Sequence, residues 1–170
     1  MRWLLALCLL SLAGCAQDDV DAQPEPAPCP GHFHVTLLVA DGDEVLPYFD
    51  SDDVDASGPV QGIHMHGDDG LIHIHPPTQT CLTLAATLFA VDVHVLQRDG
   101  GGLQVGDDVR NGTLRLDVQP WGEDWQTWDV TRLQDTVPDA ARVLLMVDAP
   151  ADVSDLRAQV PPIPATYQPR

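Results

Sequence analysis

The stretch GIHMHGDDGLIHIHP, residues 62–76, holds four histidines in two His-x-His pairs that are separated by a spacer of Gly and Asp. Side chains i and i+2 of a β-strand point to the same face of a sheet, so each pair can present two imidazoles together. Met65 and Ile74, which lie between the paired histidines, are apolar and would face a core. The pattern therefore predicts a β-hairpin with one apolar face and one histidine face.

The register of this hairpin decides whether the two pairs share a face. If Asp68-Asp69 form the turn, His64 lies opposite His73, and a turn with two further residues keeps the same parity. Only an odd slip, such as one through a bulge, would separate the pairs. Directly opposed Cβ atoms are about 5 Å apart, a distance that two imidazoles can bridge through one ion.

A third His-x-His pair, His32 and His34, lies in the β-branched and aromatic stretch HFHVTLLV, residues 32–39. All seven histidines of the chain lie between His32 and His94. Imidazole suits zinc, copper, nickel and iron, whereas calcium and magnesium prefer oxygen ligands. We therefore predict a bound zinc or copper ion as the cofactor. The predicted ligands are His32, His34, His64, His66, His73 and His75.

Three functions for this cluster stay open. Four or more imidazole ligands would close the coordination sphere of a non-enzymatic metal-binding protein. Three ligands and an open position would permit a metal-dependent hydrolase or oxidase. The histidines could instead form the solvated face of a non-metal interaction domain, which would become charged near about pH 6. The chain has no nucleophile elbow, phosphate loop or dinucleotide fingerprint that would add another chemistry.

Four further polar residues are predicted to form hydrogen bonds with the metal ligands and so to orient them. They are Asp68, Asp69, Asp92 and His94. Asp68 and Asp69 could alternatively act as a general base beside a metal-bound water, although residues in such a spacer are usually only turn formers.

The N-terminus, MRWLLALCLLSLAGC, begins with one positive residue and continues through a short apolar run. The run is too short to span a bilayer and is typical of a secretory signal, which we expect to be residues 1–14. Its ending resembles a bacterial lipobox, which implies that Cys15 is lipidated and becomes the first mature residue. In such signals an acidic residue after the cysteine favours inner-membrane retention, and Ala16 stands there instead. We expect a lipid-anchored protein of the cell envelope, at the outer membrane.

Residues 15–28 should form an acidic, Pro-rich disordered tether, and residues 29–170 a single His-rich domain. The chain contains no lysine and has a formal net charge of −18. Such a surface repels nucleic acid, so the expected partners are a metal ion and, through the lipid, a membrane. In an oxidising compartment Cys29 and Cys81 would most simply form a disulfide, while thiolate ligation of the metal is the alternative.

The remaining pattern predicts a mainly β (β-rich α+β) fold, a single small antiparallel-sheet domain with one short helix after the histidine hairpin. The helix is expected within residues 80–88, with Thr83 as its cap. Asn111-Gly112 is a strong hairpin signal between residues 103–109 and 113–118. Residues 142–147, RVLLMV, should be a buried strand, and residues 161–167, PPIPATY, an extended tail lying against the sheet.

The block HMHGDDGLIHIHPPTQTCLTLAATLFAVDV, residues 64–93, resembles a segment of uncharacterised secreted or membrane-anchored prokaryotic proteins. In those proteins a His-x-His-Asp stretch leads through Gly-x-Ile-His to a Pro-Thr and a Thr-Leu that opens a short helix. The resemblance spans most of residues 29–167 and implies a shared fold and site, but no reaction. This chain departs from the pattern at His75, where a glutamate is usual, and at Pro59, where a cysteine is usual and Cys81 is its apparent replacement.

Overall fold

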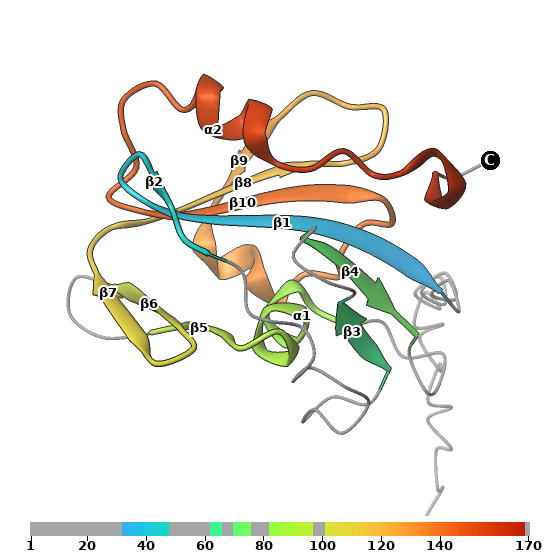
Figure 1. Ribbon diagram of the computed structural model, residues 1–170, viewed down its shortest axis with the longest axis horizontal. Helices are drawn as coiled ribbons and strands as arrows, with labels where there is room; N and C mark the ends of the chain where they lie inside the picture. The colour runs from blue at the N-terminus through green and yellow to red at the C-terminus, as the bar shows by residue number, and fades with distance from the viewer. Residues whose placement is uncertain (1–31, 48–61, 66–69, 76–81, 97–100, 169–170) are drawn as a thin grey trace, which may run out of the picture.

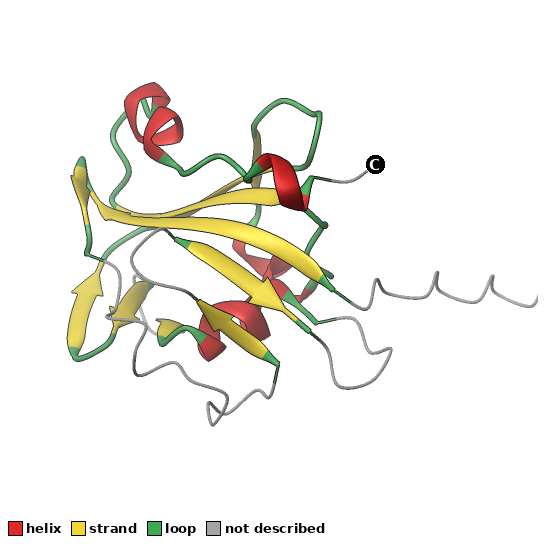
Figure 2. Ribbon diagram, turned by 45° about the vertical axis from the view of Figure 1, so that its right-hand side comes forward, coloured by secondary structure: helices red, strands yellow, loops and turns green. Residues whose placement is uncertain are grey.

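The computed structural model describes residues 32–47, 62–65, 70–75, 82–96 and 101–168. The predicted signal peptide and tether lie outside this part of the chain, as do the three cysteines Cys15, Cys29 and Cys81. The described residues form a mainly β domain with few, short helices, as predicted (Figures 1 and 2). None of the helices in these ranges is long and apolar enough to cross a membrane.

A seven-stranded sheet forms the centre of the domain, with the strand order β3-β4-β1-β10-β8-β9 and with β2 paired to one end of β1. Its strands are β1 (Phe33–Asp41), β2 (Glu44–Val45), β3 (Ile63–Met65), β4 (Leu71–Ile74), β8 (Leu114–Gln119), β9 (Gln126–Trp128) and β10 (Ala141–Val147). A second sheet has three strands, β5 (Val93–Val95), β6 (Gly102–Val105) and β7 (Asp108–Asn111). The small sheet domain therefore contains two sheets, and most of the strand pairs are antiparallel, as predicted, whereas the central pair of β1 and β10 is parallel.

The central strands β1 and β10 are covered on both faces, which explains why both are almost continuously hydrophobic. Alternate residues of β1 such as Val35 and Leu37 face a large core that includes α1 (Leu84–Ala90) and the second sheet. The residues between them, including Leu38 and Ala40, face a smaller core beneath α2 (Ser154–Gln159). The two layers lie below and above the sheet in Figure 1.

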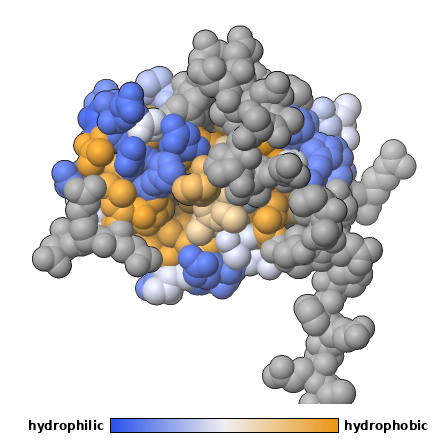
Figure 3. All heavy atoms as spheres, turned by 90° about the horizontal axis from the view of Figure 1, so that it is seen from below, coloured by the Kyte–Doolittle hydropathy of each residue, from blue (hydrophilic) through white to orange (hydrophobic). Residues whose placement is uncertain are grey.

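Helix α1 begins where the sequence predicts its cap. Thr83 is the N-cap, and its Oγ1 accepts a hydrogen bond of 3.1 Å from the Ala86 N–H. Leu84 and Leu88 of this helix are buried in the large core. Figure 3, which views the domain from below, shows a broad apolar surface on this side. Phe89 of α1 and Val109 of β7 are both half-exposed.

The prediction of a hairpin around Asn111-Gly112 is wrong. The two-residue turn lies at Gly106-Asp107, where Gly106 has a φ of 57°, and it joins β6 to β7 within the second sheet. Strand β8 instead pairs with β10 and β9 in the large sheet. A Cβ at Gly112 would displace the Asp148 carboxylate, which accepts a 2.8 Å hydrogen bond from the Thr113 N–H.

The C-terminal tail lies against the large sheet, as predicted. Thr36 of β1 donates a 2.7 Å hydrogen bond from Oγ1 to the Pro161 carbonyl, and Ile163 is buried. The tail ends in the 3-10 helix η3 (Ala165–Tyr167), and another 3-10 helix, η2 (Val130–Gln134), follows β9. Figure 1 shows the tail running from α2 along the sheet toward the end of β1 that lies nearest β4.

Candidate metal site

The strand register places three histidines side by side across β3, β4 and β1. His64 is the partner of His73 in the β3–β4 pair, and His34 is the partner of His73 in the β1–β4 pair. The predicted facing of His64 and His73 is therefore confirmed, and the third His-x-His pair does belong to an adjoining strand. Phe33 and Ile74, which lie between the paired histidines, face the large core as expected.

The imidazole rings of five histidines form one continuous cluster. The rings of His32 and His75 have centroids 3.9 Å apart, and those of His34 and His73 are 4.8 Å apart. The His64 ring lies 5.2 Å from His73 and 5.3 Å from His75, with its plane almost parallel to both. All six predicted ligands except His66, which lies outside the described residues, are thus brought together.

Three members of the cluster already converge on one point. His32, His73 and His75 each offer a ring nitrogen, and these atoms all lie within 4.8 Å of one another. A tetrahedral zinc ion with Zn–N bonds of about 2.0–2.1 Å holds its nitrogen ligands about 3.3 Å apart. Small rotations of the side chains would close the remaining gap, so this group could hold a metal ion.

The site is buried on one side and open on the other. His73 and His34 are 6% and 5% exposed, whereas His32 and His75 are exposed and His64 is intermediate. An ion would consequently reach the group from the side of His32 and His75. The buried side would hold His73 in a fixed orientation.

Desolvation and neighbouring imidazoles lower the pKa values of two of the histidines. Desolvation and the neighbouring His32 lower the pKa of His34, although the Asp139 carboxylate opposes this shift. Desolvation also lowers the pKa of His75, with further contributions from His32 and His64. Because a metal ion binds the neutral imidazole, these lowered pKa values favour metal binding at neutral pH.

His34 occupies an unusual position in the cluster. Its backbone N–H donates a 3.2 Å hydrogen bond to Oδ1 of Asp139, which fixes the strand end. Its side-chain Nε2 is buried and has no hydrogen-bond partner among the described residues. A buried polar atom without a partner is costly, and a bound ion would offset that cost.

Sequence reasoning missed Tyr167. Its ring stacks on His34, with centroids 4.1 Å apart and planes inclined by 30°, and it meets the edge of His73 at 5.2 Å. The sequence predicts that the extended PPIPATY tail lies against the sheet. No local pattern indicates that the aromatic at its end would cover the histidines.

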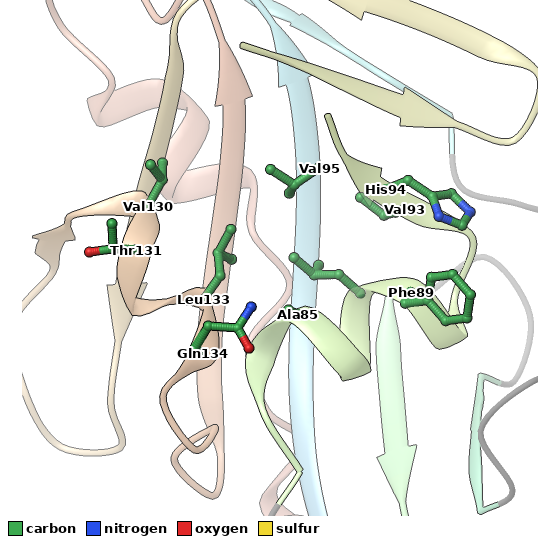
Figure 4. Close-up of a pocket in the computed structure, with 10 residues that line it drawn as sticks. Ala85, Phe89, Val93, His94, Val95, Val130, Thr131, Leu133 and Gln134 are labelled. Atoms are coloured by element: carbon green, nitrogen blue, oxygen red, sulfur yellow. The ribbon is translucent and has the colours of Figure 1, made fainter. Parts of the chain in front are cut away.

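Asp92 and His94 do not join the cluster, contrary to prediction. Nε2 of His94 lies 2.8 Å from Oδ1 of Asp92, and the His94 ring meets the edge of the Phe89 ring at 4.9 Å. Both rings line a cavity of about 230 Å³ between α1, β5 and η2 (Figure 4). The reason is that β5 enters the second sheet, which packs on the face of the large sheet opposite the histidines. Asp68 and Asp69, the other predicted supporting residues, lie outside the described residues.

No protein-family model, curated protein or solved structure matches this chain. The resemblance to secreted or membrane-anchored prokaryotic proteins therefore stays a prediction. A fold alone does not establish a function, so the chemistry of the site has to carry the functional argument.

Proposed function

We propose that the protein is a metal-binding lipoprotein of the cell envelope, which holds a zinc or copper ion through its histidine cluster. The observation that supports this most directly is the convergence of His32, His73 and His75, whose ring nitrogens lie within 4.8 Å of one another. One ion can bridge these imidazoles only if their nitrogens approach one another in this way, whereas the interaction-domain alternative does not depend on their approach.

The identity of the donors favours zinc or copper. The converging group consists of imidazoles alone, and imidazole is a good ligand for both metals and a poor one for calcium or magnesium. His34 and His64 flank the group, and either could supply a fourth ligand after a small movement. His66 is the sixth proposed ligand.

The proposed location rests on the N-terminal sequence. The signal-like run and the lipobox-like ending support lipidation of Cys15 and an anchor at the outer membrane. An oxidising envelope would also suit a disulfide between Cys29 and Cys81. The net charge of −18 would raise the local concentration of cations near the site and disfavour nucleic acid as a partner.

A second candidate, a metal-dependent hydrolase or oxidase, is favoured by the exposure of His32 and His75. A metal held only by the three converging histidines would keep a coordination position open to water or substrate on that side. Absorption spectroscopy of the cobalt form distinguishes the two candidates, because a bound water makes the spectrum change with pH and with added anions, whereas a fourth protein nitrogen does not. Four protein nitrogens would favour the binding protein, and three with an exchangeable water would favour the enzyme.

Calorimetric titration of the full chain, without a histidine tag, with Zn²⁺ or Cu²⁺ tests the metal proposal. We expect binding at micromolar or lower concentration. The variant His75→Ala should weaken binding by more than the roughly 10–100-fold that loss of a supporting residue costs, since it removes a ligand. It should still fold, because His75 is exposed and lies just beyond β4.

The matched control is His94→Ala, which removes a histidine that lies on the opposite side of the sheet and should leave the affinity unchanged. Absence of micromolar zinc and copper binding would reject the metal proposal. Equal losses in His75→Ala and His94→Ala would show that the metal binds elsewhere.

A further inference from the structure

The C-terminal tail is attached to the large sheet immediately beside the histidine cluster. At its start, the Arg142 guanidinium of β10 donates to the carbonyls of Arg157 and Val160. The Pro161 carbonyl then accepts the hydrogen bond from Thr36, which lies two residues from His34 on β1. These contacts fix the direction of the chain that follows.

Beyond Pro161, the tail is held by an apolar contact and by its own turn. Ile163 is 3% exposed and packs with Leu71 and Ala140, and Leu71 lies two residues before His73 on β4. The Tyr167 N–H donates a 2.9 Å hydrogen bond to the Pro164 carbonyl and closes η3. These contacts together fix the position of the Tyr167 ring.

That place is the buried side of the cluster. The Tyr167 ring stacks on His34 at 4.1 Å and meets the edge of His73 at 5.2 Å. His73 is the buried member of the converging group, while its other members, His32 and His75, are exposed. Tyr167 thus contacts a candidate ligand from the side opposite to the one by which an ion would enter.

We infer that Tyr167 is a positioning residue of the metal site, and that residues 161–168 are a strap whose attachment to the sheet is coupled to metal binding. This inference rests on the proposed function. Tyr167 restricts the rings of His34 and His73, so less side-chain freedom is lost when the ion binds. Coupling between two sites is reciprocal, so the ion must in turn stabilise the attached strap.

Two measurements on the full chain test the strap. The first is Zn²⁺ affinity, which Tyr167→Ala should lower about tenfold or more, in the range found for residues that orient ligands. Tyr167→Phe keeps the ring and should bind within about twofold of wild type, since the contacts with His34 and His73 are ring contacts. Phe89→Ala is the matched control, because Phe89 also packs edge-on against a histidine, His94, outside the cluster.

The second measurement is hydrogen exchange of the amides in residues 163–168, with and without Zn²⁺. Zinc should slow their exchange in the wild type and in Tyr167→Phe. A tyrosine that served only the packing of the tail would leave exchange insensitive to zinc. This readout on the wild type alone remains decisive even if Tyr167→Ala fails to fold.

The outcomes separate the strap from the proposed function. If the wild type binds zinc but the exchange of residues 163–168 does not change, the strap is rejected and the metal site stands. If the wild type binds no zinc, both are rejected. A loss of affinity in Phe89→Ala equal to that in Tyr167→Ala would also overturn the positioning role.

Discussion

Replacing Asp117 by asparagine should destabilise the fold more than any comparable change on the surface. Asp117 lies on β8 and its side chain is completely buried. Its Oδ1 accepts from Nε of Arg115 at 3.1 Å and from Thr127 Oγ1 at 2.8 Å. Its Oδ2 accepts from Nε of Arg157 at 3.0 Å. Since Arg157 belongs to α2, the carboxylate ties the helix before the strap to the sheet.

The expected cost follows from what the substitution leaves behind. The asparagine side chain would carry no charge, and its amide NH₂ would face a guanidinium that can only donate. Removing one partner of a buried ion pair costs about 3–5 kcal/mol. The side chains of Arg115 and Arg157 remain 29% and 26% exposed and regain some solvation, which favours the lower end, about 3 kcal/mol. For a domain of this size, that corresponds to a fall in Tm of about 10 °C.

Urea denaturation followed by circular dichroism measures this difference, with Asp135→Asn as the matched control. Asp135 pairs with Arg132 at 2.8 Å, but both side chains are about half exposed. Such a surface pair contributes about 0.2–1 kcal/mol. If Asp117→Asn cost less than about 1 kcal/mol, no more than such a pair, the argument that burial makes this network stabilising would be wrong.

Two further predictions concern the histidine face itself. The pKa values of His34 and His75 are lower in the folded chain than the ordinary value of 6.5. Below about pH 6.5 these two histidines therefore bind more protons in the unfolded chain than in the folded chain. The metal-free protein should therefore keep its full stability above about pH 6.5 and lose it progressively below, as thermal melts in EDTA would show; a Tm that rises on acidification would contradict this. Gly62→Ala should separate β3 from β4, because Gly62 has a φ of 88° and a Cβ there would overlap the His75 carbonyl. Gly42 has a φ of 60° but open space around it, so Gly42→Ala should lower the free energy of unfolding only by the roughly 1–2 kcal/mol of a left-handed backbone. Equal losses of unfolding free energy in the two variants, measured by urea denaturation, would refute the clash at Gly62.

The histidine hairpin was predictable because its pattern is local and has strict parity. In a strand, the side chains at i and i+2 share a face whatever the remainder of the fold does. Every even register of the hairpin keeps His64 and His73 on one face, and the observed pairing is one of these. The apolar Met65 and Ile74 then determine which face is buried.

The features that failed depend on long-range pairing. Asn111-Gly112 has the composition of a hairpin turn, but the chain there passes from the second sheet to the first, and Asp148 occupies the space beside Gly112. Similarly, His94 is a histidine like the members of the cluster, but it lies in the second sheet, away from them. No local pattern distinguishes a strand that continues one sheet from a strand that begins another, so the sequence alone could not place β5 in the second sheet.

The position of the site follows from what covers one face of β1, since this cover differs between the two halves of the strand. His34, Thr36, Leu38 and Ala40 all point to this face, which is covered by α2 over its second half. Thr36 lies at the boundary, completely buried and satisfied by the Pro161 carbonyl at which the strap begins. Beyond that boundary only the strap, with the Tyr167 ring, covers this face of the sheet. His34 and His73 are therefore buried, whereas His32 and His75 are exposed to solvent. A cluster placed under α2 would be closed to ions, and one placed on a bare strand would titrate as ordinary surface histidines. At this transition desolvation lowers the pKa values of His34 and His75, while His32 and His75 stay accessible from solvent. This combination suits the proposed binding of a metal ion, because the ion binds neutral imidazoles that it can reach.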